Sequence, residues 1–494
     1  MSDVAPHVLS IDDFATTVTD RVTHGGRLAH LYALAHTGGL ELHAIVMGPG
    51  DPLDVATLLS GPPYVVAALT PQVPAADWYE RYLHDLYGLE ARGHPDLDPL
   101  VLPRSKETSP PRPAHPDALH PIRPDTTPLP ALVRGEGIFT IPYGPVRSGI
   151  FESVEYVIET PGEDIPRVQT RIHYKHRALE AAFDGRSALD GLVLAEHVEG
   201  VASVAHAVAY TGALEALANV EPPPLAQATR LVHAELERVA NHLDSTLRHT
   251  EAAGQAVAHA RLAVTKERIQ RLRATLCGSR FSRGVVTLGG VSAVPPVDDE
   301  TFRELTRAEI ACRDDLHRLL DTPSFLDRLR GTGVLPEPVV RAHGALGPLA
   351  RGSGVGDDAR VARPYGPYRE IAVLPSVQRG ADALARQVVR TEELLHSFSL
   401  VRTGLEVVRS ASSDVVATPL PPNLSGHALG WAEAPQGEVL YAVEVDEGRL
   451  RAVRPRSASF VNLALFTAAF PRDITTDFAF IEASFGLSIA GAAL

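Results

Sequence analysis

The sequence predicts an α+β protein built from two unequal parts, and three observations carry this prediction. Short runs rich in β-branched residues near the N-terminus indicate strands, and an amphipathic helix follows them. A proline-rich stretch then interrupts the chain, which is typical of an extended linker. Beyond it, apolar residues recur mostly at helical spacing. We expect a small α/β domain (1–103), a linker (104–133) and a large, mainly helical domain (134–494) that begins with a β-sheet.

Composition excludes several classes of protein. The chain has 494 residues, of which 45% are hydrophobic and 21% are charged, as in a folded globular protein. Its formal charge of -14 argues against a general nucleic-acid binder. Two cysteines, Cys277 and Cys312, cannot hold an iron–sulfur cluster or a four-cysteine zinc site alone. The absence of a long apolar run predicts no transmembrane segment in this sequence, and the first residues do not resemble a signal peptide.

The expected elements of the small domain are two strands and one helix. Residues 41–47 and 63–69 have the length and β-branched content of strands. Residues 76–88 have apolar and aromatic side chains spaced three and four apart, and Gly88 is a plausible helix stop. These side chains belong to Trp78, Tyr79, Tyr82, Leu83, Leu86 and Tyr87.

The large domain is predicted to begin with strands and to continue with helices. Alternating patterns within 134–175 flank a turn at 161–164. Helices are expected to dominate from 186 to 330, and an amphipathic helix is expected at 383–410. Residues 438–445 and 449–456 flank Asp446-Glu447-Gly448, which predicts a hairpin. The apolar stripe expected within 229–248 consists of Val232, Leu236, Val239, Leu243 and Leu247.

Two resemblances follow from motifs in the chain. The segment 76–103, ADWYERYLHDLYGLEARGHPDLDPLVLP, resembles the signature of the 30-kDa-type subunit of respiratory complex I. Residues 134–494 resemble the large subunit of energy-converting NiFe hydrogenases and its relative, the quinone-site subunit of complex I. The wording is most similar to the formate hydrogenlyase branch, in which both domains are fused. The matching pieces are YKHRALE, AEHVEGVASVAHAVAY, ELERVANHL, CGSRFSRGVVTLGGV, EAPQGE and RPRSASFVN.

The resemblance implies a metal site whose ligands are gone. Family hydrogenases hold nickel and iron with two Cys-x-x-Cys pairs, because soft thiolates bind these metals strongly. In the first window, residues 196–206, Glu199 and Ala202 stand at the cysteine positions. In the second window, residues 486–491, Ser488 and Gly491 stand there. Gln436 replaces the arginine that the family carries beside the iron. We therefore expect no metal site in this chain, and we do not expect it to be a hydrogenase by itself.

The quinone motif of complex I is altered as well. The complex I loop G-P-x-H-P-x-x-H-G corresponds to residues 144–152, where Arg147 and Phe151 stand at the histidine positions. This argues against ordinary quinone reduction. Arg147 can still donate a hydrogen bond to a carbonyl group or pair with a carboxylate.

The remaining ionisable residues of these motifs are candidates for a cavity or proton path. They are Glu196, Glu199, His206 and Arg147, since buried carboxylates and histidines can relay protons. In the alternative, Glu199 pairs with Arg147 or Arg177 and fills the cavity. His176 and Arg177 are weaker candidates for binding a cofactor, and Arg177 can instead pair with Glu180 on a helix face.

A second group, Glu235, Arg238 and His242, shares a helix face. A buried polar network is the favoured interpretation of this group. Proton conduction is the alternative.

Two functions therefore stand side by side. In the first, the chain is an oxidoreductase subunit of a membrane-associated, complex I-like assembly, peripheral on the cytoplasmic face. The resemblance implies no cofactor in this chain, iron–sulfur clusters in partner subunits, a small iron–sulfur subunit, a ferredoxin-like subunit and antiporter-like membrane subunits. The vacated cavity would bind quinone or another acceptor and couple electron transfer to proton movement. In the second, the chain is a non-catalytic scaffold of such a complex, with the cavity packed shut. A true hydrogenase with unprecedented ligands is a minor third reading.

Overall fold

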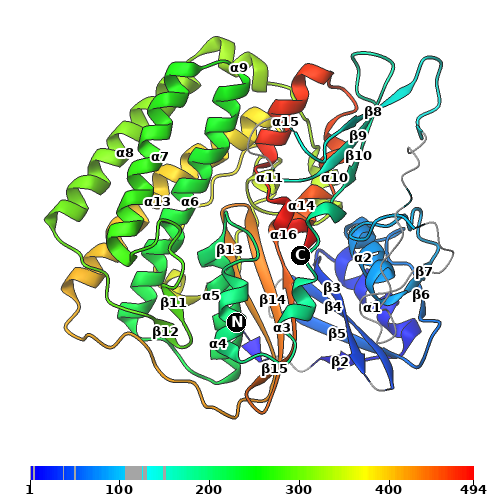
Figure 1. Ribbon diagram of the computed structural model, residues 1–494, viewed down its shortest axis with the longest axis horizontal. Coiled ribbons are helices and arrows are strands. Elements are labelled where there is room, and N and C mark those ends of the chain that lie inside the picture. The colour runs from blue at the N-terminus through cyan, green and yellow to red at the C-terminus, as the bar shows by residue number, and fades with distance from the viewer. Residues whose placement is uncertain are drawn as a thin grey trace.

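The computed structural model describes residues 2–3, 6–36, 38–48, 52–105, 125, 131–147 and 152–494. Most of the predicted linker, residues 104–133, lies outside the described residues, as does Phe151. Three regions are evident in Figure 1: a small N-terminal domain, a central sheet and a bundle of long helices. The structure has the α+β composition that the sequence predicts.

The N-terminal domain contains a four-stranded sheet in the order β2-β5-β4-β3. Its strands are β2 (His7–Val8), β3 (Arg27–His36), β4 (Gly39–Met47) and β5 (Leu53–Leu59). Helix α1 (Ile11–Thr23) packs against this sheet, and β6 (Val65–Ala67) pairs in parallel with β7 (Glu90–Arg92). The predicted helix is α2 (Asp77–Tyr87), which ends at Gly88 in the left-handed conformation with φ 72°.

The small domain shares a hydrophobic core with the large one. Trp78, Tyr79 and Tyr82 of α2 surround Phe460, with ring centroids 5.7, 4.9 and 6.1 Å from it. The first strand, β1 (Ser2–Asp3), belongs to the sheet of the large domain, where it pairs with β13. Two ends of the sequence are therefore joined both by side-chain packing and by a strand pair.

Two sheets form the β part of the large domain. The sheet at its beginning has the order β10-β9-β8, as the alternating patterns predict. The central sheet has the order β1-β13-β14-β15, and the predicted hairpin turns at Glu447 and Gly448, which both have positive φ. The strands are β8 (Phe139–Tyr143), β9 (Glu155–Thr160), β10 (Arg167–Arg171), β11 (Val286–Thr287), β12 (Gly290–Val291), β13 (Gly426–Ala434), β14 (Gly437–Asp446) and β15 (Arg449–Arg456).

Four long helices, α6 (Pro224–Ala252), α7 (Ala256–Cys277), α8 (Asp299–Leu320) and α13 (Ala383–Ser410), lie side by side (Figure 1). The predicted apolar stripe of α6 is buried among them. Helix α5 (Ser203–Leu217) covers the central sheet along β13 and β14. The shorter helices are α3 (Leu179–Phe183), α4 (Ala188–Ala195), α9 (Pro323–Leu329), α10 (Glu337–Ala342), α11 (Gly347–Arg351), α12 (Ala359–Ala362), α14 (Ala458–Leu463), α15 (Phe478–Phe485) and α16 (Ile489–Ala493).

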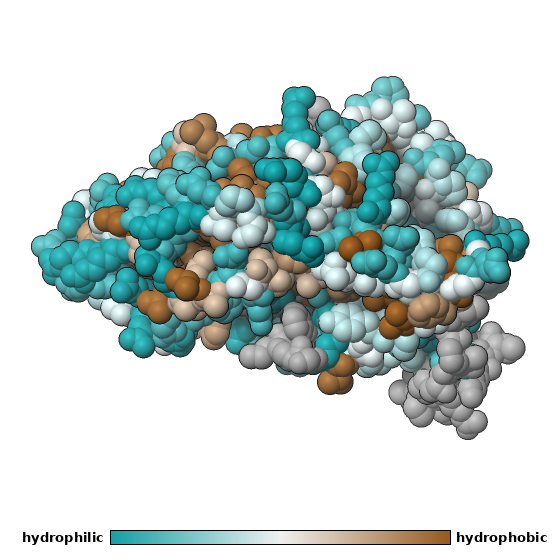
Figure 2. Space-filling view, turned by 90° about the horizontal axis from the view of Figure 1, so that it is seen from above, coloured by the Kyte–Doolittle hydropathy of each residue, from teal (hydrophilic) through white to brown (hydrophobic). Residues whose placement is uncertain are grey.

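The surface is mixed in character. Figure 2 shows hydrophobic residues on one face in small groups among hydrophilic ones, as is common for proteins in water. Within the part of the chain that the structure describes, none of the helices has the length and apolar character needed to cross a bilayer.

Candidate functional site

The two windows that we expect to correspond to the hydrogenase ligand motifs meet in the interior of the large domain. The first window runs from the end of α4 through a loop into α5, and the second runs from α15 into α16. Gly486 ends α15 in the left-handed conformation, and the Ser488 hydroxyl caps α16 by accepting from the Gly491 N–H. A Cβ atom on Gly491 would lie 2.0 Å from Glu199 Oε2, so the two windows are in direct contact.

Glu199 is the centre of this contact. Its side chain is buried, and it accepts hydrogen bonds from His206 Nε2 at 3.1 Å, Ser457 Oγ at 3.1 Å and Ser459 Oγ at 3.3 Å. His206 is also buried, and its Nδ1 lies 2.8 Å from the Tyr441 hydroxyl. Burial and the nearby Glu199 carboxylate raise the pKa of Tyr441, so its hydroxyl stays protonated. We call Glu199, His206, Tyr441, Ser457 and Ser459 the Glu199 cluster.

The other three residues that the resemblance places at cysteine positions, Ala202, Ser488 and Gly491, are also packed against neighbouring groups. Ala202 is fully buried at the start of α5. The Ser488 hydroxyl contacts the Glu152 carboxylate at 3.1 Å, and this carboxylate also accepts from the Ala490 N–H at 2.6 Å. Gly491 has no side chain, and the Glu199 carboxylate takes the space beside it.

These groups do not fit a NiFe centre. A carboxylate, a methyl group, a helix-capping hydroxyl and a glycine supply none of the bridging thiolates that such a centre needs. Among the described residues, no group of three His, Cys, Asp or Glu side chains is arranged to hold a metal ion. At the position of the family's arginine, the Gln436 amide is buried, and its two polar atoms have no hydrogen-bond partner among the described residues.

Neither Arg147 nor Arg177 forms a hydrogen bond or a close ion pair with Glu199, so the part of the alternative that pairs Glu199 with one of them is wrong. Arg147 forms an ion pair with Glu482 at 2.8 Å, and its guanidinium lies over the rings of Tyr143 and Tyr156. The aromatic contacts and the partner carboxylate hold it at the edge of the β8–β10 sheet. Arg177 donates to the backbone carbonyls of 197, 198 and 490, which ties the two windows together.

The other predicted residues hold the surroundings of the site. His176 Nδ1 lies 2.7 Å from the Ala493 carbonyl, and burial lowers the pKa of this histidine. The pairing of Glu180 with Arg177 that the sequence suggested is wrong. The Glu180 carboxylate lies 3.5 Å from Arg454 instead. Glu196 accepts from the Gly284 N–H at 2.8 Å, and partial burial raises its pKa.

Sequence reasoning missed Glu237, which caps α5, the helix that begins in the first window. Ala202 precedes α5 and has no side chain that can cap it, so the Glu237 carboxylate on α6 accepts from the N–H groups of Val204 and Ala205 at 2.9 and 3.1 Å. Burial raises the pKa of Glu237 to about 7. Its position could have indicated such a role. Glu237 stands in the motif ELERVANHL, directly before Arg238, in a helix that is buried on most sides.

We expect Glu237→Gln to change how stability depends on pH. The pKa of Glu237 is raised from 4.5 to about 7, so between these values the folded chain keeps a proton that the unfolded chain has lost. The free energy of unfolding should therefore fall as pH rises through this range, by about 3 kcal/mol from this group. Denaturant unfolding at several pH values should show a fall that is smaller in Glu237→Gln than in the native chain by this amount, because Glu433, whose pKa is also raised to about 7, still contributes in both proteins. Glu251→Gln, at the exposed end of the same helix, is the control; equal pH slopes in all three proteins would contradict the assignment.

The predicted group on α6 belongs to a buried charge network. Glu235 lies 3.1 Å from both Arg238 and Arg360, and these arginines lower its pKa to about 2 although burial alone would raise it. Arg351 lies 2.7 Å from Glu393 and 2.9 Å from Glu433, and Glu393 lies 3.0 Å from His242. Burial lowers the pKa of His242 to about 4, so this ring is neutral near pH 7. The members of the buried charge network are Glu235, Arg238, His242, Arg351, Asp358, Arg360, Glu393 and Glu433.

Comparison with known proteins gives the chain its family. Residues 13–123 match the family described as respiratory-chain NADH dehydrogenase, 30 Kd subunit, and residues 254–423 match the 49 Kd subunit. The chain is 30% identical to a carbon monoxide-induced hydrogenase of Rhodospirillum rubrum, over 62% of this chain and 86% of that protein. It is 28% identical to formate hydrogenlyase subunit 5 of Escherichia coli, over 80% and 71% of the two chains. It is 29% identical to one of the subunits of the NADH-quinone oxidoreductase of a Ruegeria species, over 63% and 81%. The chain therefore belongs to the family of hydrogenase large subunits and complex I 49-kDa subunits, with a 30-kDa-type domain fused ahead of it.

Proposed function

We propose that this chain is a structural subunit of a membrane-associated complex of the complex I or formate hydrogenlyase type, and that it carries no NiFe centre. The observation that carries the proposal is the position of the Glu199 carboxylate, which fills the space beside Gly491 and accepts three side-chain hydrogen bonds. A satisfied, buried carboxylate of this kind stabilises one arrangement of the surrounding segments. The former site then acts as a packed joint between the two windows.

Partners follow from the family. We propose a small iron–sulfur subunit, a ferredoxin-like subunit and antiporter-like membrane subunits, with the iron–sulfur clusters in those chains and this chain on the cytoplasmic face of the membrane. Relatives whose names mark them as subunits or components of larger assemblies support this proposal. Electrons in such a complex would pass between clusters of the partners, and this chain would hold the partners in place.

A second function is favoured by one feature of the Glu199 cluster. Glu199, His206 and Tyr441 form a chain of two hydrogen bonds. Nε2 of His206 bonds to Glu199, and Nδ1 bonds to the Tyr441 hydroxyl. A neutral imidazole bonded at both nitrogens can accept a proton at one and release a proton from the other. In this alternative, the chain relays protons during electron transfer. Binding of a quinone or another acceptor at the former metal site gains no support from the close packing of Glu199 against Gly491.

Glu199→Gln separates the two functions. Glutamine keeps the size of the side chain and one acceptor oxygen but cannot release a proton at neutral pH. If the site is a packed joint, the variant complex should assemble and keep at least half of the native turnover. If the site relays protons, the complex should assemble but lose most of its turnover. Glu196→Gln, in the same window but bonded to the Gly284 N–H, is the matched control.

Membership of the complex is tested by what co-purifies with the tagged chain from gently solubilised membranes. We expect mass spectrometry to find iron–sulfur and antiporter-like subunits, and elemental analysis to find no nickel in stoichiometric amount. Recovery of the chain alone, or with unrelated proteins, would contradict the proposal. Stoichiometric nickel would restore the hydrogenase reading.

A further inference from the structure

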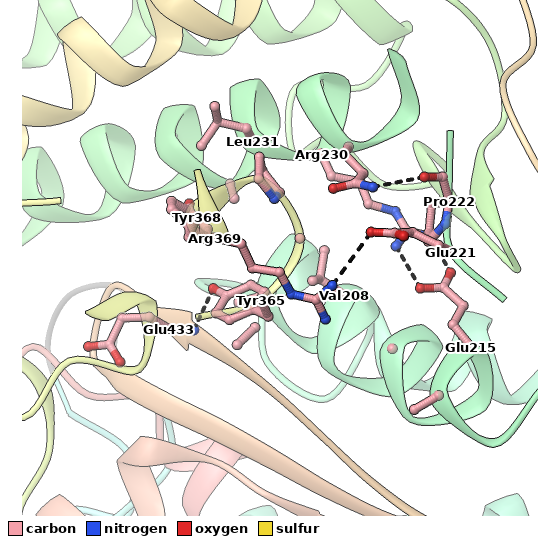
Figure 3. Close-up of a pocket in the computed structure, with 18 of the residues that line it drawn as sticks. Val208, Glu215, Glu221, Pro222, Arg230, Leu231, Tyr365, Tyr368, Arg369 and Glu433 are labelled. Carbon is pink, nitrogen blue, oxygen red and sulfur yellow. Dashed lines mark hydrogen bonds and ion pairs between the residues drawn. The ribbon is translucent and has the colours of Figure 1, made fainter. Parts of the chain in front are cut away.

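A cavity of about 530 Å³ lies apart from the Glu199 cluster, between α5, α6, the segment 365–369 and the end of β13 (Figure 3). No member of the Glu199 cluster lines it. Its size suits a small organic ligand. The side chains that matter for recognition come from Glu215, Glu221, Arg230, Tyr365, Tyr368, Arg369 and Glu433 on the polar side and from Val208, Leu231 and Ala234 on the apolar side.

Each charged side chain on the wall already has a partner of opposite charge. Arg230 and Glu215 form a two-point ion pair at 2.6 and 3.0 Å, and Arg369 lies 3.5 Å from Glu221. Dashed lines mark both pairs in Figure 3. The Glu433 carboxylate is paired with Arg351 behind the wall. A ligand with a net charge would enter a partly buried space without a counter-charge, which is unfavourable. The wall therefore selects an uncharged molecule.

The shape of the wall favours a planar ring. Tyr365 and Tyr368 are buried, with their rings 5.1 Å apart at 66° to one another. Val208 from α5 and Leu231 from α6 line the same cavity (Figure 3). An aromatic ligand ring can stack or meet edge to face with such tyrosines while its other face contacts aliphatic side chains.

The Tyr365 hydroxyl is the polar group at the point where the two tyrosines meet β13. The Tyr365 oxygen accepts a hydrogen bond from the Glu433 backbone N–H at 2.8 Å, so its own O–H is the group that it can offer to a ligand. Glu433 also lies on the cavity wall. Its carboxylate accepts from Arg351 and from the Ala359 N–H, so it is not available to a ligand.

We propose that this cavity binds an uncharged small molecule with a planar ring and a hydrogen-bond acceptor, its ring against Tyr365 and Tyr368 and its polar end at the Tyr365 hydroxyl. This site goes beyond the structural role proposed above, because it needs neither the former metal site nor a partner subunit. The packed Glu199 cluster and an open ligand cavity can exist in the same chain.

A pair of probes of matched shape tests the proposal on the purified full-length chain. The uncharged probe is 2-naphthamide and the charged probe is 2-naphthoate, and calorimetry or ligand-observed NMR measures their binding. We expect one naphthamide per chain and at least tenfold weaker binding of naphthoate. Equal affinity for both probes, or no binding of naphthamide, would overturn the proposal.

Variants place the probe in this cavity. Ala234→Phe on α6 and Ala216→Phe on α5 each put a ring into the cavity from a half-buried alanine on its wall. Each should weaken naphthamide binding at least tenfold. Ala260→Phe, on the exposed face of α7, should leave it unchanged. Circular dichroism shows which variants are folded, and a folded cavity variant that binds as the native chain does would refute the location.

The result is independent of the proposed function. Loss of naphthamide binding in Ala234→Phe with normal assembly of the complex would support the cavity and leave the structural role intact. Failure of the chain to assemble with redox partners would overturn the structural role alone, since binding is measured on the isolated chain.

Discussion

Gly491→Ala is expected to destabilise the folded chain by about 2–3 kcal/mol, a typical effect of overpacking a buried site. The added methyl group would lie 2.0 Å from Glu199 Oε2 and 2.8 Å from Ser457 Oγ. A glutamate side chain on the surface would move aside. Here His206, Ser457 and Ser459 hold the carboxylate, so moving it breaks hydrogen bonds in a buried place.

Denaturant unfolding of the purified chain measures this effect. Gly200→Ala is the control, because a methyl group there meets nothing within 4 Å. The double variant Glu199→Ala/Gly491→Ala removes the obstructing carboxylate, so the two changes should be non-additive and the methyl group should cost less in that background. If Gly491→Ala behaved like Gly200→Ala, the space beside Glu199 would be open and the packed joint would be refuted.

Arg351→Met is expected to have the largest effect of all, a loss of about 3–5 kcal/mol or failure to fold. Arg351 is fully buried and lies within 3.3 Å of Asp358, Glu393 and Glu433. Methionine preserves much of the volume but removes the charge that these carboxylates share. Uncompensated carboxylates in the interior are far more costly than the loss of one hydrogen bond.

The control for this change is Arg341→Met. Arg341 pairs with Glu337 one helical turn away on the surface, and exposed pairs of this kind contribute under about 1 kcal/mol. Thermal and denaturant unfolding of both variants compare the two sites directly. Similar small losses for Arg351→Met and Arg341→Met would mean that the buried charge network does not hold the fold together.

The sequence correctly predicted those elements that are determined by a local pattern of residues. The apolar stripe of α6, the stop at Gly88 and the hairpin around Asp446-Glu447-Gly448 all depend on neighbours within a few residues. Strand β3 was missed because it is buried on both faces and rich in leucine and alanine, so it lacks the alternation that marks a half-exposed strand. Strand β5 was missed for the same reason.

The candidate site was predictable in its composition but not in its contacts. The candidate residues were chosen from two short windows of the chain, whereas Arg147 pairs with Glu482, more than three hundred positions away. No local pattern indicates such a pair. The same holds for Glu237, whose cap on α5 depends on how α6 packs against that helix.

The shared core of the two domains bears on the ratio in which the two domains are made. Since α2 packs around Phe460 and β1 pairs with β13, the contact surface itself recognises the small domain. What the fusion adds is stoichiometry and proximity: one small domain is synthesised with each large domain, and the tether keeps the pair at high effective concentration. Because the two domains are on one chain, their docking is intramolecular and does not depend on the concentration of the protein.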